Sequence, residues 1–219
     1  MSKKPLLGVF LATLMIGALV GSIVNPLIVS QAQSTQGQTY TKAQVDFKME
    51  MRRLWEDHVT YTRIFIVETA ANIPNNATVA RLLKNQEDIG NAIKPYYGDA
   101  AGNKLTALLK QHIAIAGEVV YAAKAGNSTA LDAANKQWFA NADEIATFLS
   151  QANPTYWPQP AIKSMLYEHL NLTTAEAVAR LHGDWATDIQ TYDKVVNQAM
   201  MMADGLSGGI IGQFPTMFC

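Results

Sequence analysis

Cysteine is nearly absent from this chain of 219 residues, because Cys219 at the end is the only one. A single cysteine excludes an intrachain disulfide framework, a CxxC zinc site and a CxxCH haem attachment. Excess basic charge is also missing, since 17 Lys and Arg stand against 18 Asp and Glu and the net charge is −1. Nucleic-acid-binding domains carry clustered basic charge and a high pI. The sequence pI of about 6.4 therefore argues against nucleic acid as a partner.

Charge is scarcest at the N-terminus, where Lys3 and Lys4 are the only charged residues in 1–32. The uncharged run from Leu6 to Val24 would form a helix of about 28 Å, close to the hydrocarbon thickness of a bilayer. This length favours a transmembrane anchor, whereas the small residues Ser30 and Ala32 would suit the cleavage site of a signal peptide. Either interpretation places the rest outside the cytoplasm, because the lysines stay on the cytoplasmic side. We expect a single-pass protein of the cell membrane, or a secreted one if the segment is cleaved.

The apolar run contains a GxxxG pattern formed by Gly17 and Gly21. Two membrane helices can approach closely at such a pattern, although glycine is also common in membrane helices that do not pair. The pattern makes these glycines candidates for an interaction within the bilayer. The polar residues 33–40 that follow have no apolar period and are typical of a short tether.

From residue 41 to 204 the sequence has the pattern of a helical domain. Thr41 and Gln44 form a capping box, and apolar residues recur at helical spacing as far as Asn72. The same spacing predicts further helices over 77–94, 99–124, 129–153, a short one ending at 170, and 173–204. No alternating run of β-branched residues supports a sheet. The sequence predicts an all-α fold: an antiparallel four-helix bundle with one or two extra short helices, preceded by the N-terminal transmembrane or signal helix.

Two apolar stretches outside the long helices are candidate interaction surfaces. Residues 205–219 form a glycine-containing tail with Ile210, Ile211 and Phe214, and Tyr156 and Trp157 lie in the least regular stretch of the chain. The tail is too short to span a bilayer. It could cover an end of the bundle, touch the membrane surface or dock on a partner protein.

The common metal motifs of helical proteins are missing, because the sequence has no ExxH, HExxH or HxxxH. A looser set remains, with His58, His112 and His169 on three different predicted helices. We select His58, Glu68 and His112 as candidate ligands of a transition metal or a small molecule. The alternative is that each histidine makes one hydrogen bond and packs as a core residue. No other cofactor is implied.

The methionines permit a copper interpretation, since Met49, Met51 and 200–202 could supply thioethers to Cu(I). Consecutive methionines on a helix point in different directions, however, and methionine is a common core residue. We therefore regard packing as the simpler explanation of these residues.

Catalytic motifs are missing as well: the sequence offers no strand-turn-helix nucleophile elbow on which Ser-His-Asp catalysis could rest and no glycine-rich phosphate loop after a strand, so we expect a non-enzymatic protein. Three N-x-[ST] sequons fall at predicted turns, at Asn76, Asn127 and Asn171. They are glycan acceptors if the host glycosylates exported asparagines. The alternative is that they cap helices.

Three stretches, 54–60 (LWEDHVT), 88–95 (DIGNAIKP) and 183–185 (GDW), resemble a group of small exported all-helical proteins of prokaryotes whose activity is not established. The resemblance implies export and an all-helical fold, and nothing about mechanism. Our leading hypothesis is a membrane-tethered extracytoplasmic bundle that serves as an interaction or accessory subunit of a membrane complex, with a protein partner or a second copy of itself. The alternatives are a bundle that binds a metal or small ligand through inward histidines and carboxylates, and a solute-sensing module.

Overall fold

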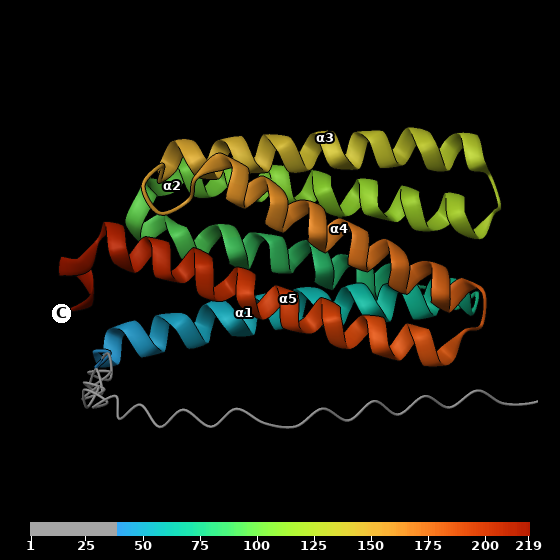
Figure 1. Cartoon of the computed structure of the whole chain (residues 1–219), viewed down its shortest axis with the longest axis horizontal. Helices are drawn as coiled ribbons and strands as arrows, with labels where there is room; N and C mark the ends of the chain where they lie inside the picture. Colours follow the sequence, from blue (N-terminus) through green and yellow to red (C-terminus); the bar gives the residue numbers. More distant parts are fainter. Residues whose placement is uncertain (1–38) are drawn as a thin grey trace, which may run out of the picture. The chain divides into compact units, whose positions relative to one another are not determined.

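The computed structural model describes residues 39–219 as a helical bundle (Figure 1). The helices in chain order are α1 (Lys42–Ala70), α2 (Asn76–Lys124), α3 (Ser128–Ala152), α4 (Gln159–Leu181) and α5 (Trp185–Gln213), followed by the 3₁₀ turn η1 (Pro215–Phe218). No strand occurs within 39–219, so the predicted all-α class is confirmed. The predicted segment 1–32, with Gly17 and Gly21, lies outside the described residues. Among the helices that are described, none is long and apolar enough to cross a membrane.

Helix α2 consists of two antiparallel arms, 76–97 and 99–124, that meet at Gly98. The backbone of Gly98 has φ +82° and ψ 167°, a conformation that favours glycine over residues with a side chain. Gly90 and Gly102 face each other across the arms, and a Cβ on Gly90 would lie 2.7 Å from the carbonyl oxygen of Gly102. The predicted interruption between 94 and 99 is therefore confirmed.

The helices form a closed ring in which each packs on its neighbours in the chain and α5 returns to α1. The largest buried apolar side chains come from four of the five helices: Met51, Leu54, Ile66, Ile145, Leu170, Met202 and Ile210. The two ends of the described segment also meet, because Oγ1 of Thr41 donates to the carbonyl oxygen of Phe218 at 2.5 Å. The same hydroxyl accepts from the backbone N–H of Gln44, so the predicted capping box is confirmed.

The prediction that a helix starts at Thr173 was wrong, because α4 continues through this residue. The hydroxyl of Thr173 donates to the carbonyl oxygen of His169, one turn earlier in the same helix, at 2.9 Å. The interruption falls instead at Gly183, which has φ +72°. Asp184 then caps α5 by accepting from the backbone N–H of Thr187. The described chain consequently has five long helices rather than four with short additions.

Helix α5 also extends beyond the predicted end at Gly205, into the segment predicted to be a tail. Its glycines provide room for a packed indole: a Cβ on Gly209 would lie 2.0 Å from Nε1 of Trp157. That nitrogen donates to the carbonyl oxygen of Gly205 at 3.3 Å, and Trp157 is buried. Gly209 and Gly212 therefore permit close packing of Trp157 and Tyr156 on α5, and the glycines of this segment do not end the helix.

We expect Gly209→Ala to lower the free energy of unfolding by about 1–3 kcal/mol, because the new methyl group overlaps the indole of Trp157. Gly208→Ala is the matched control, since a Cβ at Gly208 meets no atom within 4 Å. The control should be neutral or stabilising by up to about 1 kcal/mol, from helix propensity alone. Urea unfolding of the two variants measures the difference, and equal stability would contradict the packing role of Gly209.

Candidate functional site

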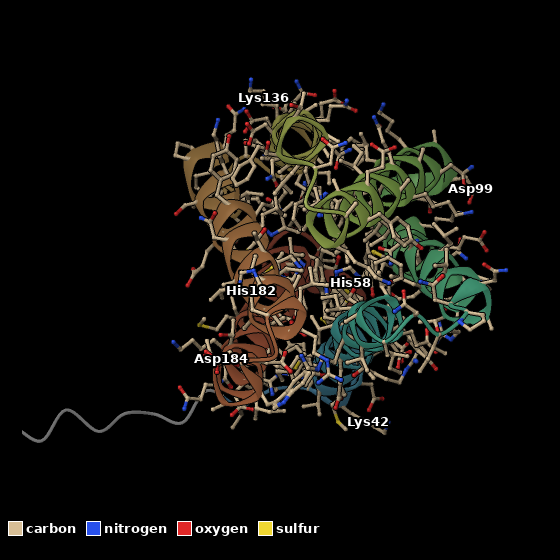
Figure 2. All side chains as sticks on the ribbon, turned by 90° about the vertical axis from the view of Figure 1, so that its right-hand side faces the viewer. Lys42, His58, Asp99, Lys136, His182 and Asp184 are labelled. Carbon is tan, nitrogen blue, oxygen red and sulfur yellow. The ribbon has the colours of Figure 1, made fainter. Side chains whose placement is uncertain are left out.

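An apolar cavity of about 220 Å³ lies inside the bundle and is walled by residues of α1, α2, α3 and α4. Most of its lining is aliphatic or aromatic, including Phe65, Ile66, Leu82, Ile113, Val119 and Val120. Its lining also contains three histidines: His58, His112 and His169. Figure 2 shows His58 in the interior of the bundle, while the labelled Lys42, Asp99, Lys136 and Asp184 lie at its edge.

Two large side chains of the cavity wall reach the molecular surface. Tyr121 on α2 is 48% exposed and Val178 on α4 is 38% exposed, although both also line the cavity. The ring of Tyr121 packs against Phe65 at a centroid distance of 5.6 Å. A small molecule could therefore enter between α2 and α4 by a movement of these two side chains.

His112 has both ring nitrogens engaged by α3. The side-chain N–H of Asn141 donates to the carbonyl oxygen of Leu108 at 3.2 Å, which orients the amide so that its oxygen faces Nδ1 of His112 at 2.7 Å. Nε1 of Trp138 donates to Nε2 of His112 at 3.0 Å. His112 is therefore a neutral ring that carries its proton on Nδ1, and it has no nitrogen free for a ligand.

His169 is held by one amide from α5. The side-chain N–H of Gln198 donates to the carbonyl oxygen of Met165 at 2.9 Å, so the amide oxygen faces Nδ1 of His169, 3.0 Å away. An amide oxygen can only accept, which places the proton of neutral His169 on Nδ1. Nε2 of His169 is then a bare acceptor.

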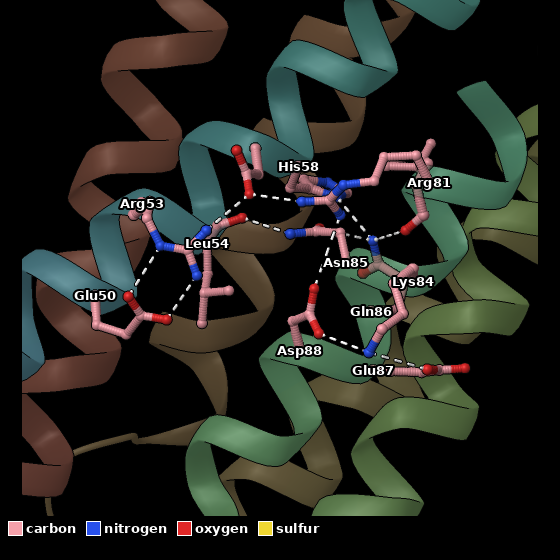
Figure 3. A network of polar contacts seen from close by, with 12 residues as sticks. Glu50, Arg53, Leu54, His58, Arg81, Lys84, Asn85, Gln86, Glu87 and Asp88 are labelled. Atoms are coloured by element: carbon pink, nitrogen blue, oxygen red, sulfur yellow. Dashed lines mark hydrogen bonds and ion pairs between the residues drawn. The ribbon is translucent and has the colours of Figure 1, made fainter. Parts of the chain in front are cut away.

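His58 is held in the opposite tautomer by Gln86 of α2 (Figure 3). The side-chain nitrogen of Gln86 donates to the carbonyl oxygen of Leu82 at 2.9 Å and to the amide oxygen of Asn85 at 3.0 Å. The same NH₂ group lies 3.3 Å from Nδ1 of His58, so its two hydrogens are shared among three acceptors. Because an amide nitrogen cannot accept a hydrogen bond, Nδ1 of His58 faces it without a proton. Neutral His58 consequently carries its proton on Nε2, where it is a donor.

The three rings favour the neutral form. Burial lowers the pKa of His58 well below its usual value, and the charges that His169 and His112 would carry lower it further. Burial also lowers the pKa of His112 to about 4 and lowers that of His169, although the hydrogen bonds that these rings donate to the amide oxygens of Asn141 and Gln198 oppose the shifts. The rings of His58 and His169 lie 5.6 Å apart between centroids. At neutral pH the cavity therefore presents one N–H donor and one bare nitrogen acceptor on apolar walls.

A buried ion cluster lies on α1, α4 and α5. Some of its residues are adjacent in the sequence to residues that line the cavity. Arg63 contacts both Glu176, at 2.8 Å, and Asp188, and Arg180 contacts Asp188 at 3.2 Å. Burial raises the pKa of Glu176 to about 7, even though Arg63 opposes the shift. Burial also acts to raise the pKa of Asp188, but the hydrogen bonds and charges of Arg63 and Arg180 outweigh it and leave that pKa lowered. Glu176 and Asp188 are both buried and face inward to Arg63.

The candidate metal set is only partly brought together. His58 and His112 both line the cavity, whereas Glu68 does not, and its buried Oε2 has no hydrogen-bond partner. In the part of the chain that the structure describes, no three or more His, Cys, Asp or Glu side chains are grouped so as to hold a metal ion. His169 was not among the selected ligands, but it lines the cavity together with His58, whereas Glu68 does not.

The candidate interaction residues near the C-terminus lie mostly in the core. Trp157 and Ile210 are buried, and Ile211 and Phe214 are partly buried against the same cluster. Tyr156 is 50% exposed and covers Gly212. These residues therefore pack the loop onto α5, and only Tyr156 presents much surface.

The three sequons occupy different positions. Asn76 is the first residue of α2, and Asn127 caps α3 by accepting from the backbone N–H of Ala130 at 3.0 Å. Asn171 is exposed in the middle of α4, so its predicted location in a turn was wrong. The capping alternative therefore applies to Asn127.

Sequence reasoning missed the amides that orient the histidines. Each replaces an apolar residue in an inward stripe: Gln86 lies four residues after Leu82, and Gln198 lies three residues after Val195. Asn141 likewise follows Trp138 by three residues. An amide at an inward position of a predicted helix indicates a specific hydrogen-bond partner, because buried amides occur where such a partner is present.

Comparison with protein-family models, curated proteins and solved structures gave no significant match. The interpretation of the site therefore rests on its own geometry.

We expect the free energy of unfolding to fall as the pH is lowered from about 6.5 towards 4. The unfolded chain takes up protons on its histidines in this range, while burial keeps His58, His112 and His169 neutral in the folded chain. Urea unfolding at pH 7, 5.5 and 4.5 measures this slope. His169→Phe should make the slope shallower, whereas His182→Phe, which removes an exposed histidine outside the cavity, should retain it. An unchanged slope in His169→Phe would contradict the assignment.

Proposed function

We propose that the bundle binds a small, largely apolar molecule in the cavity walled by α1, α2, α3 and α4. The observation that carries the proposal is the combination of a volume of about 220 Å³ with an almost wholly apolar lining. An apolar protein cavity of about 150 Å³ is large enough for benzene. This cavity therefore has room for a molecule of one to two rings.

The size of the cavity supports a binding role because packing defects of this size are costly. Protein interiors are packed as densely as organic crystals, and few voids exceed a water molecule. At about 24 cal/mol for each Å³, a cavity of this volume lowers the free energy of unfolding by about 5 kcal/mol relative to a filled core. That cost is comparable to the entire stability of many domains, about 5–15 kcal/mol. A ligand that fills the cavity would recover much of it.

A metal is a poorer candidate for the same cavity. Both nitrogens of His112 are engaged by Trp138 and Asn141, so this residue would have to lose a hydrogen bond before it could bind a cation. An apolar ligand can occupy the cavity without the loss of either hydrogen bond of His112.

The membrane-tethered accessory role predicted from the sequence is a separate proposal that depends on residues 1–32. It is compatible with a binding bundle, since a tethered domain outside the cytoplasm could capture or deliver an apolar molecule. Purification of the native protein in mild detergent tests it. We expect a partner or a second copy to co-purify, and a lone monomer would count against this role.

We expect naphthalene to raise the melting temperature of the wild-type protein in proportion to its occupancy of the cavity. Ala177→Leu and Gly117→Leu should abolish this shift, because both positions line the cavity and a larger side chain would fill it. A Cβ at Gly117 meets no atom closer than 3.9 Å, so the added side chain has space.

Ala175→Leu is the matched control, since Ala175 lies on α4 near Ala177 but is exposed and does not line the cavity. It should retain the shift caused by naphthalene. If wild-type protein shows no shift, or if both filled variants respond as the wild type does, the proposed site is wrong.

A further inference from the structure

We infer that the ligand of this cavity carries a hydroxyl group, which accepts a hydrogen bond from Nε2–H of His58 and donates one to Nε2 of His169. This inference rests on the proposed function and names the chemical class of the molecule. It follows from the tautomers that Gln86 and Gln198 impose on the two rings.

The two histidines present unlike groups because their amides are anchored in opposite senses. Gln86 turns its NH₂ group to His58, while Gln198 turns its oxygen to His169. Each amide is fixed by a backbone carbonyl that can only accept, that of Leu82 for Gln86 and that of Met165 for Gln198. Neither amide can reverse without losing this bond.

The second nitrogen of each ring has no hydrogen-bond partner among residues 39–219. The threonine one turn after each histidine is committed elsewhere, since Thr62 donates to the carbonyl oxygen of His58 at 2.8 Å and Thr173 to that of His169 at 2.9 Å. Both rings line the cavity, and their centroids are 5.6 Å apart. One group of the ligand could therefore meet both rings.

A hydroxyl is the small group that matches this pair, because it donates one hydrogen bond and accepts others. A hydrocarbon would leave the N–H of His58 unpaired in an apolar space, which costs about 1–3 kcal/mol. A carboxylate would face the bare Nε2 of His169, and no Lys or Arg of the described chain lines the cavity to compensate its charge.

The volume limits the apolar part of the ligand. About 220 Å³ exceeds the benzene-sized cavity of about 150 Å³ by roughly half, which suits a bicyclic ring. 2-Naphthol combines a ring system of this size with one hydroxyl. It serves as a probe of the chemical class.

The experiment is isothermal titration of the full chain at pH 7 with four probes: 2-naphthol, 2-methoxynaphthalene, naphthalene and 2-naphthoate. We expect 2-naphthol to bind at least tenfold more tightly than naphthalene, because it supplies both missing hydrogen bonds. The methyl ether keeps the acceptor and loses the donor, so it should also bind at least tenfold more weakly than 2-naphthol. 2-Naphthoate should bind most weakly. A site without partners for the hydroxyl would favour naphthalene, since the hydroxyl loses hydration on entry.

Two variants assign the preference to the rings. His58→Phe and His169→Phe should each reduce the advantage of 2-naphthol over naphthalene at least threefold while naphthalene still binds. His182→Phe, which alters an exposed histidine, should leave the advantage unchanged. The comparison of the four probes on wild-type protein does not depend on how well these variants fold.

The outcomes separate the two levels of the proposal. If naphthalene binds as tightly as 2-naphthol, or 2-naphthoate binds more tightly, the hydroxyl assignment is overturned and the apolar binding site stands. If 2-methoxynaphthalene binds as tightly as 2-naphthol, the hydrogen bond from the ligand hydroxyl to His169 is overturned. If none of the four probes binds, both the inference and the proposed function are overturned.

Discussion

A buried side-chain amide that donates to the carbonyl oxygen of a neighbouring helix is the contact on which this bundle depends. Asn85 of α2 reaches Leu54 of α1, Asn141 of α3 reaches Leu108 of α2, and Gln198 of α5 reaches the carbonyl of Met165 on α4. A helical carbonyl oxygen has a second lone pair after its own helical hydrogen bond. Each amide therefore fixes the register of two helices and, by its remaining atoms, the orientation of a polar neighbour.

Register and site chemistry are consequently coupled in this molecule. The amide of Gln198 that ties α5 to α4 also decides where the proton of His169 lies, and Asn141 does the same for His112. Apolar packing alone would permit small shifts between helices, whereas these bonds fail outside a narrow range of distances. The ion cluster around Arg63 adds a further link from α1 to α4 and α5, although a buried ion pair is weak evidence of net stability.

The sequence predicted most of the fold because helical period, capping and interruption are local signals. The capping box at Thr41 and the interruption at Gly98 were both predicted from residues close together in the sequence. Thr173 and Gly205 look like helix boundaries in the sequence, but the hydroxyl of Thr173 donates within α4 and the carbonyl oxygen of Gly205 accepts from Trp157. His58 and His112 were found as inward residues, but their tautomers depend on amides from other helices. No pattern within one helix contains that information.

The hydrogen bond between Thr41 and Phe218 brings both ends of the described chain to one end of the bundle, and Cys219 is exposed beside it. The cavity, in contrast, is lined on α1 by residues of its second half, from His58 to Ile66. The single thiol of the protein is thus a natural attachment point that leaves the cavity free. Immobilising the protein through Cys219 would present every molecule on a sensor surface in one orientation, with Tyr121 and Val178 accessible to the solution.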